Sequence, residues 1–205
     1  MELNINGNPG TGNHFQDVTM KHVGSYNPAA KKVIINQTPI APQSRLASWF
    51  ACLQEDFKNN VRLQKKMNDI MRYRTRLPHT IGLEQKLLDG GFAKKAIDKA
   101  RRQKQSYAKK ATKYQYYEMA NKIDNYLFAI VSDHFDREVL PLIEDEKPLR
   151  EINQAVYDKV VVPVMEELNA VGDSDTCLCY TLDDVFGMLY YLTGNCHINW
   201  AIYDV

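Results

Sequence analysis

Two cysteine motifs near the end of the sequence carry side chains of the kind that bind metal ions. Cys177 and Cys179 form a Cys-x-Cys pair, and Cys196 with His197 follows 17 residues after the pair. Thiolate and imidazole are preferred zinc ligands, but Cys-x-x-Cys is the more usual spacing. Adjacent residues also point to opposite sides of an extended strand. We therefore predict buried, reduced cysteines, with zinc at Cys177, Cys179, Cys196 and His197 as the weaker alternative.

Two other groupings contain catalytic residue types without a complete catalytic arrangement. Asp133, His134 and Asp136 lie close together, but apolar neighbours flank the histidine, as is typical of a helix surface. The segment GNPGTGNH at residues 7–14 has the glycines of a phosphate-binding loop, yet Asn13 and His14 replace its lysine and its hydroxyl residue. We predict no catalytic residue, no cofactor and no enzymatic activity.

A dense run of basic residues between Lys94 and Lys113 is the clearest candidate binding feature. The basic strip consists of Lys94, Lys95, Lys99, Arg101, Arg102, Lys104, Lys109, Lys110 and Lys113, with Tyr107, Tyr114, Tyr116 and Tyr117 interleaved or following. Such a strip is a solvated helix face, a surface for an acidic protein, or a phosphate-binding surface with stacking aromatics. Our prediction is protein docking through Lys99, Arg102, Lys109 and Lys113, with nucleic acid as the alternative partner.

The charge distribution along the chain supports an acidic partner surface. The formal net charge is only +1. Residues 45–132 nevertheless contain 19 Lys and Arg against 8 Asp and Glu, whereas residues 133–205 contain 4 against 15. The basic segment can therefore face the chain's own acidic C-terminal half, that of a second copy, or another acidic partner.

Length and composition favour one principal cytoplasmic domain. The chain has 205 residues, of which 44% are hydrophobic, and it contains four cysteines. Its first residues, MELNINGNPG, lack the pattern of a signal peptide, and no run of about 18 apolar residues is present. We predict reduced cysteines, a cytoplasmic location and no membrane partner.

The spacing of apolar residues predicts an all-α fold, a helical bundle with one long central helix. Residues 1–40 form a Gly- and Asn-rich arm, predicted to be extended or a β-ribbon, and residues 41–205 form a helical interaction domain. Helices are predicted over 44–74, 83–88, 92–139 and 148–169, with a stop near Pro141 and a kink at Pro163. The last begins at Thr181, where Asp184 completes a capping box, and ends at Gly194.

The final segment GMLYYLTGNCHINW, residues 187–200, together with IGLEQKLLDGG, residues 81–91, carries a family resemblance. The chain resembles the small helical C-terminal domains attached to effectors of bacterial ABC-three-component conflict systems, which overlap Lamassu-type phage defence. The resemblance implies a domain that connects an effector to an ABC or SMC-like ATPase and a small middle component. The chain departs from the usual arrangement, because the roughly 40 residues before the domain are too few for a nuclease or protease effector. Either the effector is a separate chain, or this chain is a trimmed or stand-alone adaptor. No catalytic residue is implied.

The ending of this segment has a physical interpretation of its own. Gly194 and Asn195 can turn the chain out of a helix, after which alternation places Ile198 and Trp200 on one side. His197 and Asn199 then lie on the other side. Trp200 is predicted to be a core residue, with an interface anchor as the alternative. The predicted partner-binding residues here are Gly194, Asn195, His197 and Trp200.

Together these features predict a non-catalytic interaction module of an anti-phage system, docked on an ABC or SMC-like ATPase complex. We also predict self-association, because Tyr114, Tyr116 and Tyr117 exceed what one small core absorbs. The alternative function is a helical nucleic-acid-binding protein that uses the strip from Lys94 to Lys113.

Overall fold

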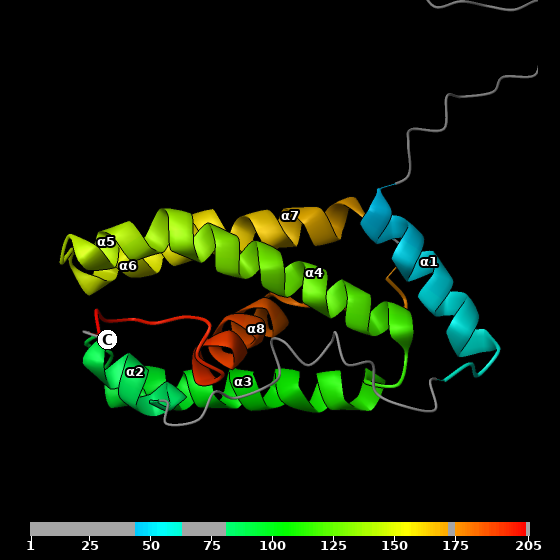
Figure 1. Ribbon diagram of the computed structural model, residues 1–205, viewed down its shortest axis with the longest axis horizontal. Helices are drawn as coiled ribbons and strands as arrows, with labels where there is room; N and C mark the ends of the chain where they lie inside the picture. The colour runs from blue at the N-terminus through cyan, green and yellow to red at the C-terminus, as the bar shows by residue number, and fades with distance from the viewer. Residues whose placement is uncertain (1–43, 63–80, 172–174, 204–205) are drawn as a thin grey trace, which may run out of the picture. The chain divides into compact units, whose positions relative to one another are not determined.

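The computed structural model describes residues 44–62, 81–171 and 175–203, and every regular element in these ranges is helical (Figure 1). The α-helices are α1 Arg45–Lys58, α2 Leu83–Asp89, α3 Lys94–Tyr114, α4 Glu118–His134, α5 Leu140–Glu144, α6 Leu149–Ala155, α7 Val162–Ala170 and α8 Leu182–Gly194, and two π-helical segments are η2 Phe135–Val139 and η3 Val156–Val161. The predicted all-α class is confirmed for these ranges. The predicted arm at residues 1–40 lies outside them. Among the described residues, no helix is both long enough and apolar enough to cross a membrane.

Helix α8 lies at the centre of the helical assembly (Figure 1). It packs against α3 on one side and against α4, η3 and α7 on the other. Val185, Met188, Leu189 and Leu192 of α8 are completely buried. α1 packs across α4 at one end, so the core extends to the outer side of α4.

The predicted continuous helix over 92–139 is wrong. Helix α3 ends at Tyr114, and α4 begins at Glu118 after a turn that returns the chain alongside α8 (Figure 1). The side-chain amide of Asn121 donates to the carbonyl oxygens of Gln115 (2.8 Å) and Tyr117 (2.7 Å), which fixes the turn without glycine or proline. Folding back buries the apolar faces of both helices, and this tertiary gain overrides the uninterrupted helix propensity.

The predicted helix over 44–74 is also wrong in its extent. α1 begins after Ser44, whose side chain accepts from the backbone N–H of Ala47 (3.1 Å), and it ends at Lys58. Asn60 follows in the left-handed region with φ 53°, a conformation that asparagine tolerates better than most residues. Val61, which continues the apolar spacing, is 55% exposed. The rest of the predicted span lies outside the described residues.

Pro141 and Pro163 are accommodated by π-helical turns. Directly before each proline, the backbone N–H of Leu140 donates to the carbonyl of Phe135, and that of Val162 donates to Tyr157, five residues back. The two π-helical segments, η2 and η3, pack against each other. Helical structure therefore continues past Pro141 through α5 and ends at Glu144, three residues beyond the proline near which the stop was predicted.

Candidate docking surface on helix α3

The terminal tryptophan of the LTGNCHINW ending is a core residue. Trp200 is 3% exposed, and its ring makes edge contacts with Phe92 (5.0 Å between centroids) and Phe135 (5.1 Å). Its indole N–H donates to the hydroxyl of Thr193 at 3.0 Å. The partner of the indole thus comes from the same ending. The preferred core interpretation of Trp200 is confirmed.

The two segments that carry the family resemblance meet in space. The ammonium of Lys86, which is 3% exposed, donates to the carbonyl of Ile198 at 3.0 Å. A Cβ at Gly90 would lie 2.8 Å from Cβ of Trp200 and from its carbonyl oxygen, so the chain passes directly over this glycine. The hydroxyl of Tyr203 donates to Asp89 at 2.9 Å. We call residues 194–203, packed on α2, the C-terminal clasp.

The other predicted binding residues of the ending also belong to the clasp. Gly194 and Asn195 are buried, and His197 is half-buried. A Cβ at Gly194 would collide with the ammonium end of Lys104, which lies across the end of α8. The backbone N–H of His197 donates to the carbonyl of Leu192 at 3.0 Å. These positions give the residues a role in folding, and their contact with a partner stays a prediction.

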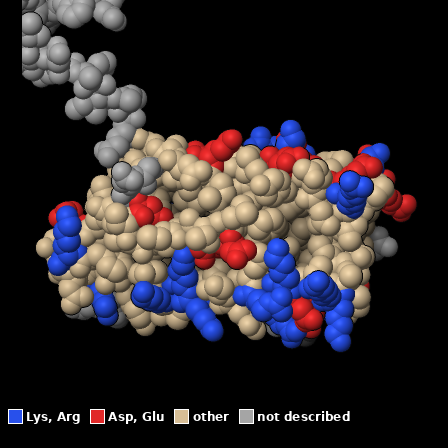
Figure 2. All heavy atoms as spheres, turned by 180° about the vertical axis from the view of Figure 1, so that it is seen from behind, with Lys and Arg blue, Asp and Glu red and all other residues tan. Residues whose placement is uncertain are grey.

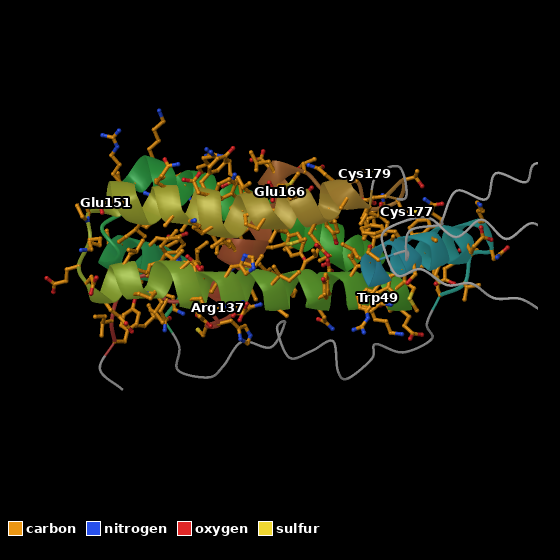
Figure 3. The ribbon with its side chains drawn as sticks, turned by 90° about the horizontal axis from the view of Figure 1, so that it is seen from above. Trp49, Arg137, Glu151, Glu166, Cys177 and Cys179 are labelled. Atoms are coloured by element: carbon orange, nitrogen blue, oxygen red, sulfur yellow. The ribbon has the colours of Figure 1, made fainter. Side chains whose placement is uncertain are left out.

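The four residues of the alternative zinc site do not come together. Cys177 and Cys179 precede α8 and lie beside α1 (Figure 3), whereas Cys196 and His197 follow the other end of α8. A helix of this length separates them by about 20 Å. In the part of the chain that the structure describes, no three Cys, His, Asp or Glu side chains are grouped so that they could hold a metal ion.

The preferred prediction of buried cysteines is also wrong, because Cys179 is exposed and Cys177 and Cys196 are only half-buried. The loop at residues 175–180 is organised by a carboxylate that sequence reasoning missed. Asp175 accepts from the backbone N–H groups of Leu178 and Cys179, both at 2.8 Å, and of Tyr180 at 3.0 Å. Burial raises the pKa of the Cys177 thiol above its ordinary value, so this thiol stays protonated at neutral pH. The available signal was the aspartate itself, since Asp side chains in loops accept hydrogen bonds from nearby backbone N–H groups.

A buried polar pair was also missed. Asp124 of α4 is 3% exposed and accepts from the hydroxyl of Tyr180. Burial, and then the nearby Asp124 carboxylate, raise the pKa of Tyr180 well above its ordinary value, so the hydroxyl remains a donor. The spacing of Asp124 from Ala120 and Leu127 placed it on the buried face, which was the available signal.

The basic strip divides between two faces of α3. On the inner face, the side-chain amide of Gln103 donates to Asp183 at 2.8 Å, and the ammonium of Lys110 lies 2.6 Å from the carboxylate of Asp184. Asp184 also accepts from the backbone N–H of Thr181 as part of the predicted capping box, which is confirmed. Part of the strip therefore binds the acidic start of α8 within the chain.

Five of the other cations of the strip form one exposed stripe along α3. We call Lys95, Lys99, Arg102, Lys109 and Lys113 the outer stripe; all are exposed and follow helical spacing. In Figure 2, Lys and Arg side chains gather along the lower margin, where α3 lies. None of the five forms an ion pair with a described residue, whereas neighbouring Arg101 pairs with Asp98 and with Glu84. All four lysine and arginine residues predicted to dock a protein belong to this stripe.

The tyrosines that alternate with the basic residues do not form a stacking surface with them. Tyr107 is completely buried, and Tyr117 is 5% exposed and stacks on Phe57 of α1 at 4.3 Å. Tyr114 also packs on Phe57, at 5.5 Å. Of the tyrosines from which self-association was predicted, only Tyr116 is exposed, at 41%. Phe57 of α1 therefore covers Tyr114 and Tyr117, two of the tyrosines from which self-association was predicted.

Structure and sequence together define a small helical domain closed by a C-terminal clasp. Residues 82–200 match the family described as C-terminal domain 9 of the ABC-three component (ABC-3C) systems, and the chain belongs to this family. The resemblance inferred from the two motif segments is confirmed. None of the curated proteins or solved structures compared matches the chain. The matched residues run from the start of α2 to Trp200, so they end within the clasp and exclude α1.

Proposed function

We propose that this chain is a non-catalytic assembly module of an ABC-three-component anti-phage system, and that the outer stripe docks onto an acidic surface of another component. The observation that supports this function most directly is the set of five exposed cations on one face of α3, none of which forms an ion pair with a described residue. The family gives the setting, since its domains belong to multi-component systems.

The close spacing of the positive charges in the outer stripe favours a docking surface over a helix face that only contacts water. Positions 95 to 113 span about 27 Å of helix. Like charges held at this spacing repel one another and raise the local potential, which attracts an oppositely charged surface and increases the association rate. The inner face of α3 already shows the same chemistry, because Lys110 binds Asp184 of α8.

The partner that we propose is the ABC or SMC-like ATPase of the system with its small middle component. In this arrangement the chain acts as an adaptor or effector-associated subunit, in the cytoplasm and without a catalytic residue of its own. A second copy of the chain is a further protein partner, since residues 133–205 are acidic. Nucleic acid is the second candidate ligand, because the outer stripe could also neutralise phosphates.

Charge reversal of the stripe tests the proposal. Replacing Lys99, Arg102, Lys109 and Lys113 by Glu should abolish binding of the purified ATPase and middle component in isothermal titration calorimetry. The matched control replaces Lys122, Lys147, Arg150 and Lys159 by Glu, which changes the net charge equally on other elements and should leave binding within about threefold.

The same variants separate the alternatives. Light scattering reports any second copy, and fluorescence anisotropy with a random duplex reports DNA. Unchanged binding of the ATPase and middle component by the stripe variant would contradict the docking proposal. Tight duplex binding at physiological salt that is lost in the stripe variant would favour the nucleic-acid function.

A further inference from the structure

Beside the outer stripe, α8 presents a row of apolar side chains to the outside. Leu182, Phe186 and Tyr190 recur every four residues, so they follow one another along the same side of α8. Leu182 is 41% exposed, and Phe186 and Tyr190 are half-buried. We call these three residues the apolar row. Large apolar side chains on an outward helix face are typical of contact surfaces.

The apolar row and the outer stripe are continuous. The ammonium of Lys99 lies 6.0 Å from the ring centroid of Phe186, within the range of a cation–π contact. Phe186 stacks against Tyr190, with centroids 6.4 Å apart and planes at 19°. Lys99 therefore belongs to both features, and cations and apolar groups lie side by side on one surface formed by α3 and α8.

The apolar row is held from below by the clasp. Tyr190 stacks on buried Trp200, with centroids 6.4 Å apart and planes at 29°. Trp200 is in turn fixed by Phe92 and Phe135. The rings of the row consequently rest on the core, and a partner that contacts Phe186 meets a positioned side chain. Such preorganisation lowers the entropy cost of binding.

We propose that the outer stripe and the apolar row form one docking surface for a protein segment in which acidic residues adjoin apolar residues. This inference rests on the proposed docking function and names the chemistry of the partner. The acidic side chains would meet Lys95, Lys99 and Arg102. The apolar side chains would cover Leu182 and Phe186, which a purely acidic surface would leave in water.

The geometry favours such a segment over single-stranded nucleic acid. Base stacking requires an open ring face. One face of Phe186 is directed to Tyr190, and the Lys99 ammonium lies over the ring. Leu182 offers no ring.

Two peptides of equal negative charge test this inference on the full chain. One combines Glu with Leu and Phe, and the other combines Glu with Ser and Gly; a single-stranded oligothymidine of equal charge is the third probe. Fluorescence anisotropy should show the apolar acidic peptide binding roughly tenfold more tightly than the polar one. Equal binding of the two peptides, or tighter binding of the oligothymidine, would overturn the inference.

Variants of the apolar row test whether it causes the difference in affinity between the two peptides. Leu182→Glu and Phe186→Ala should each remove the difference between the peptides, while Leu88→Glu, at a 57% exposed leucine on α2, should preserve it. Leu182→Glu places an acid in the first turn of α8, where the helix dipole favours it, so folding should be retained. Circular dichroism checks this point.

The outcome separates the two proposals. If the stripe variant stops binding the ATPase and middle component but the row variants bind the peptides like the wild type, the docking function stands and the composite surface is wrong. If the ATPase and middle component do not bind the wild-type chain, the docking function fails. Selective binding of the apolar acidic peptide would then still show that the outer stripe and the apolar row bind acidic and apolar side chains together.

Discussion

At the scale of single residues, the family-like ending is explained by close packing around α2. Gly90 allows Trp200 to pass over the helix end, Gly194 leaves room for Lys104, and Thr193 provides the acceptor for the indole. Each of these residue types has one local reason, and none requires a ligand. The ending therefore closes the domain by packing on α2.

The buried ammonium of Lys86 should make the stability of the fold depend on pH. Desolvation lowers the pKa of this buried ammonium below its ordinary value. Between the lowered pKa and the ordinary one, the unfolded chain binds more protons, so the free energy of unfolding should rise with pH in that window. Lys86→Met should flatten this rise and, because Ile198 loses its donor, lower stability by about 1 kcal/mol at neutral pH.

Urea unfolding from about pH 7 to about pH 9.5 measures this slope, with Lys95→Met, at an exposed lysine, as the control. The upper limit of this pH range lies below the pH at which the tyrosines of the unfolded chain ionise. The pKa of Tyr190 is raised to about 12 by burial and that of Tyr203 to about 12 by burial and Asp89. These hydroxyls lower stability as the unfolded tyrosines ionise near pH 10. Parallel slopes for wild type and Lys86→Met would contradict the prediction.

At the scale of elements, the contact between α3 and α8 depends on Gly187. A Cβ at this position would lie 2.6 Å from Cβ of Tyr107 and 2.7 Å from the carbonyl oxygen of Gln103. Neither atom can move without its helix. Gly187→Ala should therefore destabilise the chain by about 1–2 kcal/mol, after the gain in helix propensity.

Gly194 provides the comparison for this prediction. The atoms that a Cβ would meet there belong to the flexible end of Lys104, including Cε at 2.9 Å, and can rotate away. Gly194→Ala should consequently cost much less than Gly187→Ala in urea unfolding. Equal losses would mean that the close approach at Gly187 does not set the distance between α3 and α8.

The sequence correctly predicted the helix boundaries that depend on interactions between neighbouring residues. The capping box at Thr181 and the glycines after α2 lie where the sequence placed them, with Gly91 at φ 79°. The break between α3 and α4 lacks such a signal. Asn121 stabilises it only once Gln115 and Tyr117 have turned back, so the break depends on tertiary contacts.

The candidate surface was predictable in part for the same reason. Helical spacing alone places Lys99, Arg102, Lys109 and Lys113 on one face. Lys110 is of the same residue type, and its pairing with Asp184 requires the position of α8. The apolar row on α8 has no such signal, because the residue types of Leu182, Phe186 and Tyr190 do not distinguish a surface position from a core position.

At the scale of the whole molecule, the folded helical region extends beyond the residues that match the family. α1 lies outside residues 82–200, yet Leu46, Phe50 and Leu53 are at most 1% exposed. Trp49 lies at the junction with α4 (Figure 3), with its ring 5.8 Å from that of Tyr126. Without α1, this aromatic surface of α4 would meet water.

Two truncations test where the folding domain begins. Removal of residues 1–43 should leave helical circular dichroism and cooperative melting nearly unchanged, because residues 1–40 contain few large apolar side chains.

Removal of residues 1–62 also takes α1, whose buried side chains each contribute about 1.5–3 kcal/mol. That loss approaches the total stability of a small domain, about 5–15 kcal/mol. The shorter chain should therefore melt at a much lower temperature or aggregate. Identical melting of both truncated chains would show that α1 is not part of the core.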